Sequence, residues 1–343
     1  MRTVLRHRLF WPAAVLVLLL VGNVFFTPSF FSIRLQDGHL YGSLIDILRA
    51  STPLILVGLG MTLVIATGGI DLSVGSVMAI AGAVACLRIS DLPDPNSVGG
   101  VLAAVGFALL LALVLGLWNG LLVAVGGIQP IIATLILMVA GRGLAQLITD
   151  GQIINVRSDP YRVIGAGYVL TVPVSVIIAG LFVAAAALLV RRSALGLLLE
   201  SVGGSPAASR LAGIQARTLI LTVYVFAALC AGIAGLIFSS NVSSADGNNT
   251  GNLIELDAIL AVVIGGTALT GGRFSIAGTV LGAVIINTLN ITVYTVGIPS
   301  NVTLLFKAVV VVVLCLLQSP SFRAWASGVK RLLPTPSRAG GAA

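Results

Sequence analysis

The sequence predicts an all-α polytopic membrane protein with about ten membrane-spanning helices, within a range of roughly eight to ten. Three observations predict this fold class. Of 343 residues, 58% are hydrophobic and only 9% are charged, against roughly 25% charged in an ordinary soluble domain. The mean hydropathy is +1.12, which also excludes a disordered chain. The third observation is a series of apolar runs long enough to cross about 30 Å of hydrocarbon.

Ten apolar runs are candidate helices. Two of them, 51–67 and 256–270, are short for a full crossing. The first run follows three arginines, but it is longer than the apolar region of a signal peptide and no Ala-x-Ala site follows it. We therefore interpret it as an uncleaved anchor helix. The runs lie at residues 9–27, 51–67, 72–90, 99–125, 128–149, 171–190, 217–240, 256–270, 275–297 and 300–318.

The net charge of +8 describes topology and gives no sign of a nucleic-acid partner. Only two of the nineteen cations are lysines, and no basic tract of the kind that binds phosphate backbones occurs. With the amino terminus in the cytoplasm, twelve cations fall inside, and all acids except Asp71 and Glu200 fall outside. The positive-inside rule therefore predicts an N-in, C-in arrangement. The twelve cations are Arg2, Arg6, Arg8, Arg191, Arg192, Arg210, Arg217, Arg273, Arg323, Lys330, Arg331 and Arg338.

The chain looks doubled, with a glycine-broken helix in each half. Residues 67–76 read Thr-Gly-Gly-Ile-Asp-Leu-Ser-Val-Gly-Ser between two apolar runs, and residues 265–272 read Gly-Gly-Thr-Ala-Leu-Thr-Gly-Gly between two more. Transporters are often built from two related halves with interrupted helices at matching places. We predict discontinuous helices here, in two related halves.

The first break carries one ionisable group, Asp71, with Ser73 two residues further on. Broken helices in a membrane are tolerated in protein or beside a water-filled path. One interpretation is that both residues cap the start of the third helix in a cytoplasmic turn. The other gives them a direct role in the translocation path.

Further polar residues interrupt the apolar runs. Amide and hydroxyl groups suit an uncharged polyhydroxy solute, and they suit hydrogen bonds between helices equally well. The candidates for the translocation path are Asn119, Asn287 and Asn290, together with Asp71 and Ser73. Arg142 and Lys307 favour snorkelling or pairing over ligand binding. The glycine pairs 116/120 and 232/235 predict close helix packing.

The loop at 191–217 predicts a short helix outside the hydrocarbon. Ser205 is a good N-cap, Pro206 a good first helical residue, and Gly213 a good stop. Taken alone, this pattern suits a well-capped connector or a docking helix for a partner.

Several kinds of chemistry are absent from the sequence. No nucleotide-binding G-x-x-x-x-G-K-[ST] occurs, and neither G-x-S-x-G nor H-E-x-x-H is present, so we expect no enzymatic activity. His7 and His39 both lie near the amino terminus, outside any intramembrane proton relay. The cysteines at 86, 230 and 315 lack metal-ligand spacing and predict no metal site, disulfide or cofactor. Transport is then driven from elsewhere or is passive. A secondary carrier or a passive facilitator for a small polar solute is the alternative to an energised importer.

Three segments together resemble a known family. They are residues 60–76, the loop at 195–214, and residues 255–266 followed by Gly271-Gly272-Arg273. They are similar to the inner-membrane permeases of ribose-type sugar ABC importers, the permeases of binding-protein-dependent transport systems. Within that family, the stretches 35–48 and 128–148 look most like a galactofuranose permease.

The resemblance implies a sugar permease of the bacterial inner membrane, without a cofactor, powered by a cytoplasmic ABC ATPase. Its other partners would be a periplasmic sugar-binding protein, near the acidic segment 246–257, and a second permease subunit, the same or related. The segment 241–252 departs from the family pattern, which bears on receptor pairing and on the sugar. Residues 1–343 would form one transmembrane permease domain, with a coupling loop at 191–217 and a cytoplasmic tail at 319–343. The residues assigned to ATPase coupling are Glu200, Gly203, Ser205, Pro206, Arg210 and Gly213.

Overall fold

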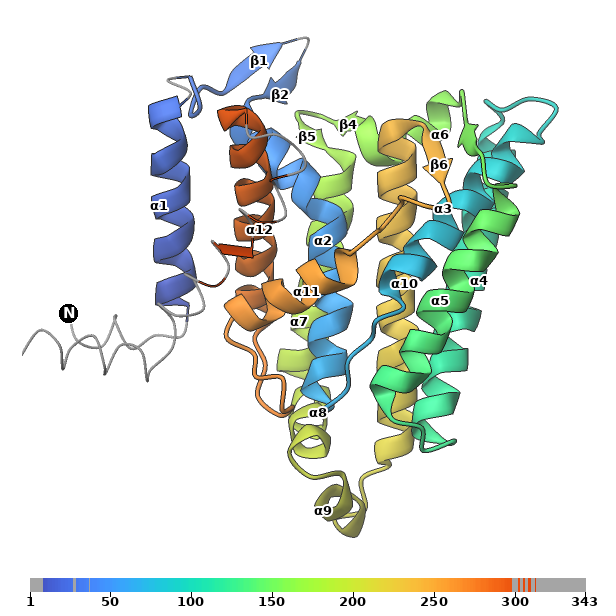
Figure 1. Ribbon diagram of the computed structural model, residues 1–343, viewed down its shortest axis with the longest axis vertical. Helices are drawn as coiled ribbons and strands as arrows, with labels where there is room; N and C mark the ends of the chain where they lie inside the picture. The colour runs from blue at the N-terminus through green and yellow to red at the C-terminus, as the bar shows by residue number, and fades with distance from the viewer. Residues whose placement is uncertain are drawn as a thin grey trace, which may run out of the picture.

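The computed structural model describes residues 9–26, 29–36 and 38–297, together with residues 302, 305, 308, 309 and 312. This part of the chain is mostly helical, and its long helices run side by side (Figure 1). The helices are α1 (Phe10–Phe26), α2 (Ser43–Ala66), α3 (Val74–Ser90), α4 (Val98–Ala124), α5 (Pro130–Ile148), α6 (Asp159–Ala166), α7 (Val174–Arg192), α8 (Leu195–Gly204), α9 (Pro206–Leu211), α10 (Ala216–Val242), α11 (Ile254–Ile264) and α12 (Ile276–Val296).

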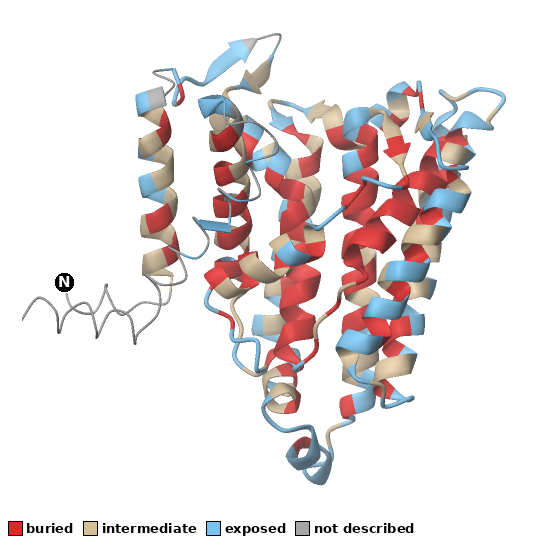
Figure 2. Cartoon of the chain, viewed as in Figure 1, coloured by how far each residue is buried: buried red, intermediate tan, exposed pale blue. Residues whose placement is uncertain are grey.

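Two helices form the centre of the bundle. Within an 18-residue apolar stretch of each helix, 78% of α2 and 67% of α10 are buried inside the protein. The corresponding buried shares are 22% in α4 and 17% in α7. Figure 2 shows the same contrast between buried central helices and an exposed rim. Helix α10 packs on α4, α2 and α3, while α2 also packs on α12 and α11. The rim helices therefore present their apolar side chains outward, as a lipid-facing surface requires.

Small residues let the central helices approach closely. A Cβ placed on Gly116 of α4 would lie 2.6 Å from the Ala228 Cβ of α10, and one on Gly232 would lie 2.8 Å from the Ala112 Cβ. A Cβ on Gly235 would overlap the carbonyl oxygen of Met78 in α3. The prediction that these glycines form packing faces is confirmed, because no larger residue fits without a shift of the backbone.

Six helices of the described chain are long and apolar enough to cross a membrane: α2, α4, α5, α7, α10 and residues 276–293 of α12. Helix α2 begins eight residues before the expected run and is 24 residues long, so it is not short after all. The run at 256–270 gives only the 11-residue α11, which covers about 16 Å at 1.5 Å per residue and is too short to span the hydrocarbon. The described residues do not include most of the run at 300–318, with Lys307 and Cys315, or the tail at 319–343.

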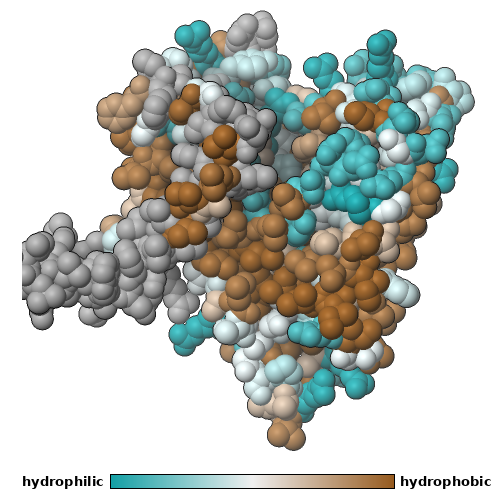
Figure 3. Space-filling model, in the orientation of Figure 1, coloured by the Kyte–Doolittle hydropathy of each residue, from teal (hydrophilic) through white to brown (hydrophobic). Residues whose placement is uncertain are grey.

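Short strands gather at one end of the bundle (Figure 1). They pair antiparallel as β1 (Arg34–Gln36) with β2 (His39–Tyr41), β3 (Ile153–Asn155) with β6 (Ser244–Asp246), and β4 (Tyr168–Val169) with β5 (Val172–Pro173). The small helix α9 occupies the opposite end. Between the ends, Figure 3 shows a broad apolar surface with polar surface above it and around the base of α9 below it. This banding fits a bilayer around the middle of the protein.

Candidate functional site

The first break separates α2 from α3. Helix α2 ends at Ala66, the chain continues as an irregular segment, and α3 begins at Val74 (Figure 1). Leu72 donates its backbone N–H to the Thr134 hydroxyl of α5, with N and Oγ1 3.1 Å apart. Thr134 in turn donates to the carbonyl oxygen of Pro130 at 2.9 Å. The broken segment is therefore fixed to α5 by side-chain hydrogen bonds, as an irregular backbone inside a membrane requires.

Asp71, Ser73 and Asn119 form one hydrogen-bonded cluster. Ser73 donates both its backbone N–H and its hydroxyl to Oδ1 of Asp71, at 2.9 and 2.6 Å. Asn119 of α4 donates its amide to the Ser73 hydroxyl at 2.8 Å. The three side chains are only 1–2% exposed, so the cluster is closed to solvent in this conformation. Asp71 holds the Ser73 N–H just ahead of α3, whereas the Ser73 side chain makes no capping bond of its own.

Two polar atoms in and beside this cluster have no hydrogen-bond partner within the described part of the chain. They are Oδ1 of Asn119 and the hydroxyl of Tyr224, both residues being 1% exposed. Tyr224 lies in α10, and a Cβ on Gly69 would lie 2.6 Å from its hydroxyl oxygen. Tyr224 was not among the predicted site residues. A polar hydroxyl within an apolar helix, about two turns from the start of α10, was the only available signal.

The second break separates α11 from α12. A Cβ on Gly278 of α12 would overlap the carbonyl oxygen of Gly265 at the end of α11, so the two backbones are in direct contact. Within the break, Ser275 donates its backbone N–H to the Thr267 hydroxyl at 3.2 Å. The order of elements is reversed between the breaks. A long helix precedes the first break, and a long helix follows the second.

Both breaks meet the loop between α7 and α10 at one point. Gly272 of the second break donates its backbone N–H to the carbonyl oxygen of Ala66, the last residue before the first break, at 2.9 Å. Gly203 of α8 lies against the same pair. A Cβ there would overlap the Ala66 oxygen and would lie 2.5 Å from the Gly272 nitrogen. The loop and the two breaks therefore cannot move independently at this point.

The expected short helix in the loop is present as α9. Ser205 accepts the Ala208 N–H on its hydroxyl at 3.2 Å, Pro206 is the first helical residue, and Gly213 follows the helix with φ +82°. The predicted cap and stop are confirmed. Helix α9 projects from the end of the protein, and Leu211 is 92% exposed there. Arg210 is exposed beside it.

The structure divides the six residues assigned to ATPase coupling into two groups. Ser205, Pro206, Arg210 and Gly213 are exposed on and around α9. Gly203 and Glu200 belong to α8, a helix of ten residues that was not predicted from the sequence. Glu200 is half-buried and lines a cleft of about 460 Å³ with Arg191 and Phe274. The α8 group thus faces the body of the protein, and the α9 group faces away from it.

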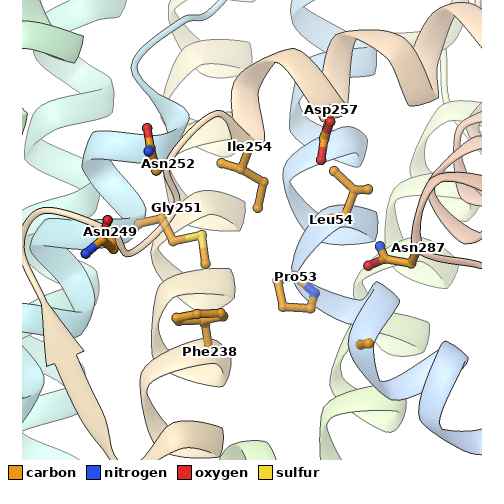
Figure 4. Close-up of a pocket in the computed structure, with 11 residues that line it drawn as sticks. Pro53, Leu54, Phe238, Asn249, Gly251, Asn252, Ile254, Asp257 and Asn287 are labelled. Carbon is orange, nitrogen blue, oxygen red and sulfur yellow. The ribbon is translucent and has the colours of Figure 1, made fainter. Parts of the chain in front are cut away.

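A cavity of about 240 Å³ lies beside the first half of α2, about two to three turns from the start of that helix. It is bounded by α2, α3, α10, α11 and α12 (Figure 4). Its polar side chains are Asn249, Asn252, Asp257 and Asn287, and the ring of Phe238 faces the same space. Asn287, a predicted path residue, therefore lines a cavity. Within the described residues the lining does not include Asn290, Asp71, Ser73 or Asn119.

The loop that carries three of the cavity-lining residues is held from outside the cavity. Arg142 of α5 donates from Nη1 to the carbonyl oxygens of Thr250 at 2.7 Å and Gly247 at 3.3 Å. Asp246 accepts the backbone N–H groups of Asn248 and Asn249 at 2.8 and 3.2 Å. Burial raises the pKa of Asp246, but the hydrogen bonds from Asn249 and Asn248 outweigh it and hold the pKa below its ordinary value. Arg142 therefore pairs with backbone rather than with a ligand.

Comparison with known proteins identifies the kind of permease to which this architecture belongs. Residues 43–315 match the family model described as the permease component of the branched-chain amino acid transport system. The chain belongs to this family. It is a multi-pass membrane protein and a transport permease subunit. No solved structure matches it.

The curated relatives of this permease are named as sugar permeases. It is 46% identical over 332 residues to the galactofuranose transporter permease protein YtfT of Escherichia coli K12, covering 95% of each chain. It is 39% identical to the fructose import permease protein FruF of Bifidobacterium longum, covering 96% of this chain and 93% of that protein. It is 37% identical to the ribose import permease protein RbsC of E. coli K12, covering 89% of this chain and 92% of that protein.

Proposed function

We propose that this permease carries a monosaccharide across the bacterial inner membrane into the cytoplasm as a subunit of an ABC importer, with ATP hydrolysed on a separate subunit. The names of its relatives support a monosaccharide, and the 46% identity to YtfT makes galactofuranose the first solute to test. The chain itself supplies no nucleotide-binding motif, so the energy enters through contact with a partner.

One observation carries this proposal: the contact of Gly203 with both broken helices. Helix α9 is capped, exposed and apolar at Leu211, as expected of a helix that docks in a cleft of an ATPase. Helix α8 continues from it to the Ala66–Gly272 hydrogen bond. A displacement of α9 by the ATPase would therefore reach the starts of α3 and α12 together. Glu200, Gly203, Ser205, Pro206, Arg210 and Gly213 are the residues assigned to this coupling.

The proposal implies an orientation of the protein in the membrane and two further partner proteins. With an N-in, C-in topology of about ten spans, α9 lies in the cytoplasm and the strand pairs lie in the periplasm. The strand-bearing end would then meet a periplasmic sugar-binding protein. A second permease subunit, the same or related, would complete the membrane core. Residues 1–343 form one domain in this interpretation, with its coupling loop at 191–217 and its cytoplasmic tail at 319–343.

The proposed solute path includes the cavity at Asn287. In the conformation described here it does not include the buried cluster of Asp71, Ser73 and Asn119. Asp71, Ser73 and Asn119 would enter the path when the break at 67–73 shifts, because their polar groups are then released from one another. Asn290 lies one turn beyond Asn287 on α12 and would follow it along the path. Thr62 and Thr279 lie between the cavity and the breaks, with their hydroxyl oxygens 2.6 Å apart.

The test is reconstitution in vesicles with the candidate ATPase and sugar-binding protein. Uptake of labelled galactose, fructose and ribose is measured with each component left out in turn. The importer hypothesis predicts that uptake requires ATP, the ATPase and the binding protein. Uptake that continues without ATP or without the ATPase would refute it and would favour a secondary carrier or a passive facilitator.

A further inference from the structure

We propose that the cavity between α2, α3, α10, α11 and α12 is a low-affinity recognition site for a single sugar ring. This inference rests on the proposed function and adds a place in the membrane chain where the solute itself is bound. The groups that would bind it are the side chains of Asn252, Asp257 and Asn287, with the ring of Phe238. Asn249 would contribute only its side-chain oxygen, because its side-chain nitrogen donates to Oδ2 of Asp246 at 2.8 Å.

The chemistry of the lining suits a neutral polyhydroxy compound. Each sugar hydroxyl is both a donor and an acceptor of hydrogen bonds. An asparagine amide offers both functions, and an aspartate carboxylate accepts from two neighbouring hydroxyls. The four polar side chains lie on two sides of the cavity, Asn249 and Asn252 on one and Asp257 and Asn287 on the other (Figure 4). Hydroxyls on opposite edges of a ring would therefore find partners at the same time.

Phe238 supplies the apolar surface that such a ring also needs. It is 37% exposed, although most of its neighbours on the outer half of α10 are buried. Its ring faces the space between α10 and α2. An aromatic face beside amides and a carboxylate is the usual composition of a site for a small polar ligand with one apolar side.

The size of the cavity limits the ligand. About 240 Å³ lies just below the roughly 300–1,000 Å³ of pockets for drug-sized ligands. It corresponds to about eight water molecules at ~30 Å³ each. A single sugar ring is closer to this volume than a disaccharide is.

The polar groups are held in place by contacts that do not enter the cavity. Arg142 binds the carbonyl oxygens of Gly247 and Thr250, and Asp246 caps the turn at Asn248 and Asn249. A Cβ on Gly75 of α3 would overlap the carbonyl oxygen of Gly251, so the loop is also in backbone contact with α3. A preorganised set of hydrogen-bonding groups binds with less loss of conformational entropy than a mobile one.

Protection of a single cysteine tests whether a sugar enters the cavity. The reporter is Asn252→Cys in a Cys315→Ser background, because Cys86 and Cys230 are buried. The matched control is Asn248→Cys, an exposed position in the same loop that does not line the cavity. Labelling by a maleimide is timed on the full chain in lipid nanodiscs with galactose, fructose or ribose, and with sucrose as the oversized control. We expect at least one monosaccharide to slow labelling at position 252 severalfold, with no effect of sucrose and none at position 248.

A second measurement tests recognition during transport. Asp257→Asn keeps the shape of the side chain and removes its charge, so sugar uptake in the complete vesicle system should fall about tenfold. Asn248→Leu, the matched control, should leave uptake unchanged. Uptake unchanged in Asp257→Asn, together with unprotected labelling at position 252, would overturn the inference. ATP-dependent uptake would persist in that case, so the importer proposal would survive. Loss of its ATP dependence would refute that proposal instead.

Discussion

The first break, at residues 67–73, is tied to its neighbours by side chains, whereas the second, at 265–275, is tied by backbone. In the first, Ser73 bonds to Asn119 of α4 and Leu72 bonds to Thr134 of α5, over sequence separations of 46 and 62 residues. In the second, Ser275 makes local side-chain hydrogen bonds with Thr267 and Gly278, and the distant contacts are glycine backbones. The first break should therefore weaken in steps as side chains are removed. The second should fail when a Cβ is added at Gly265 or Gly278, where the two backbones are in contact.

The largest expected effect is at Gly278. In Gly278→Ala the new Cβ overlaps the Gly265 carbonyl oxygen, and backbone cannot move aside as a side chain can. We expect a loss of about 3 kcal/mol in the free energy of unfolding, at the upper end of the usual cost of overpacking. Thermal unfolding in detergent measures it. Gly180→Ala on α7, where nothing lies within 4 Å of the new Cβ, is the control and should be neutral or slightly stabilising.

The next effect is at Asp71. In Asp71→Ala, the buried N–H and hydroxyl of Ser73 lose their acceptor, which costs about 2 kcal/mol in unfolding free energy. The same unfolding assay applies. Asp91→Ala, an exposed aspartate at the end of α3, should change stability little. Equal stability of the two variants would show that the side-chain network does not hold the first break.

A smaller effect on stability, with a larger one on transport, is expected at Gly203. In Gly203→Ala, α8 must move away from Ala66 and Gly272, which it can do at the surface for about 1–2 kcal/mol. ATP-driven uptake should then fall about tenfold, the size of an ordinary coupling free energy. Gly204→Ala, with open space around the new Cβ, is the matched control. If both variants take up sugar at the same rate, the contact of Gly203 with Ala66 and Gly272 does not couple ATP hydrolysis to transport.

The smallest effect is at the Thr62–Thr279 hydrogen bond. A double-mutant cycle with Thr62→Val and Thr279→Val should give a coupling energy of about 0.6 kcal/mol, the average for such bonds between membrane helices. The four unfolding curves are recorded in one detergent. A value near zero would show that the two hydroxyls bond equally well to the helix carbonyls behind them.

Some site features could be predicted because they depend on neighbours in the sequence. Ser205, Pro206 and Gly213 form a start and a stop within nine residues, and the structure has α9 between them. The contact of Asp71 with Ser73 is also local. Asn287 was chosen only as a polar residue in an apolar run. That criterion also selected Asn290, which does not line the cavity, and it could not separate the two because both lie on one helix.

Other features depend on helices that are distant in the sequence. In the sequence, Phe238 is one apolar residue among many, Asn249 and Asn252 belong to a loop, and Asp257 lies near the start of a helix. They line one cavity only because their segments pack against α2 and α12. Tyr224 meets the first break from 155 residues away because α10 is the central helix. The bond from Gly272 to Ala66 likewise joins two turns with no complementary sequence signal, since it uses backbone groups alone.

By itself, the sequence determined the class of protein, the places where helices break, and the caps of α9. Transfer of apolar runs into a bilayer and hydrogen bonding over one or two turns are local properties of the chain. Only the tertiary structure decided that, of the two short runs, α2 is a full span and α11 is not. It also decided that Asn119 bonds to Ser73 rather than lining the cavity, and that Gly203 lies on both breaks. These follow from which helix backbones approach closely, and close approach depends on small residues meeting across the whole bundle.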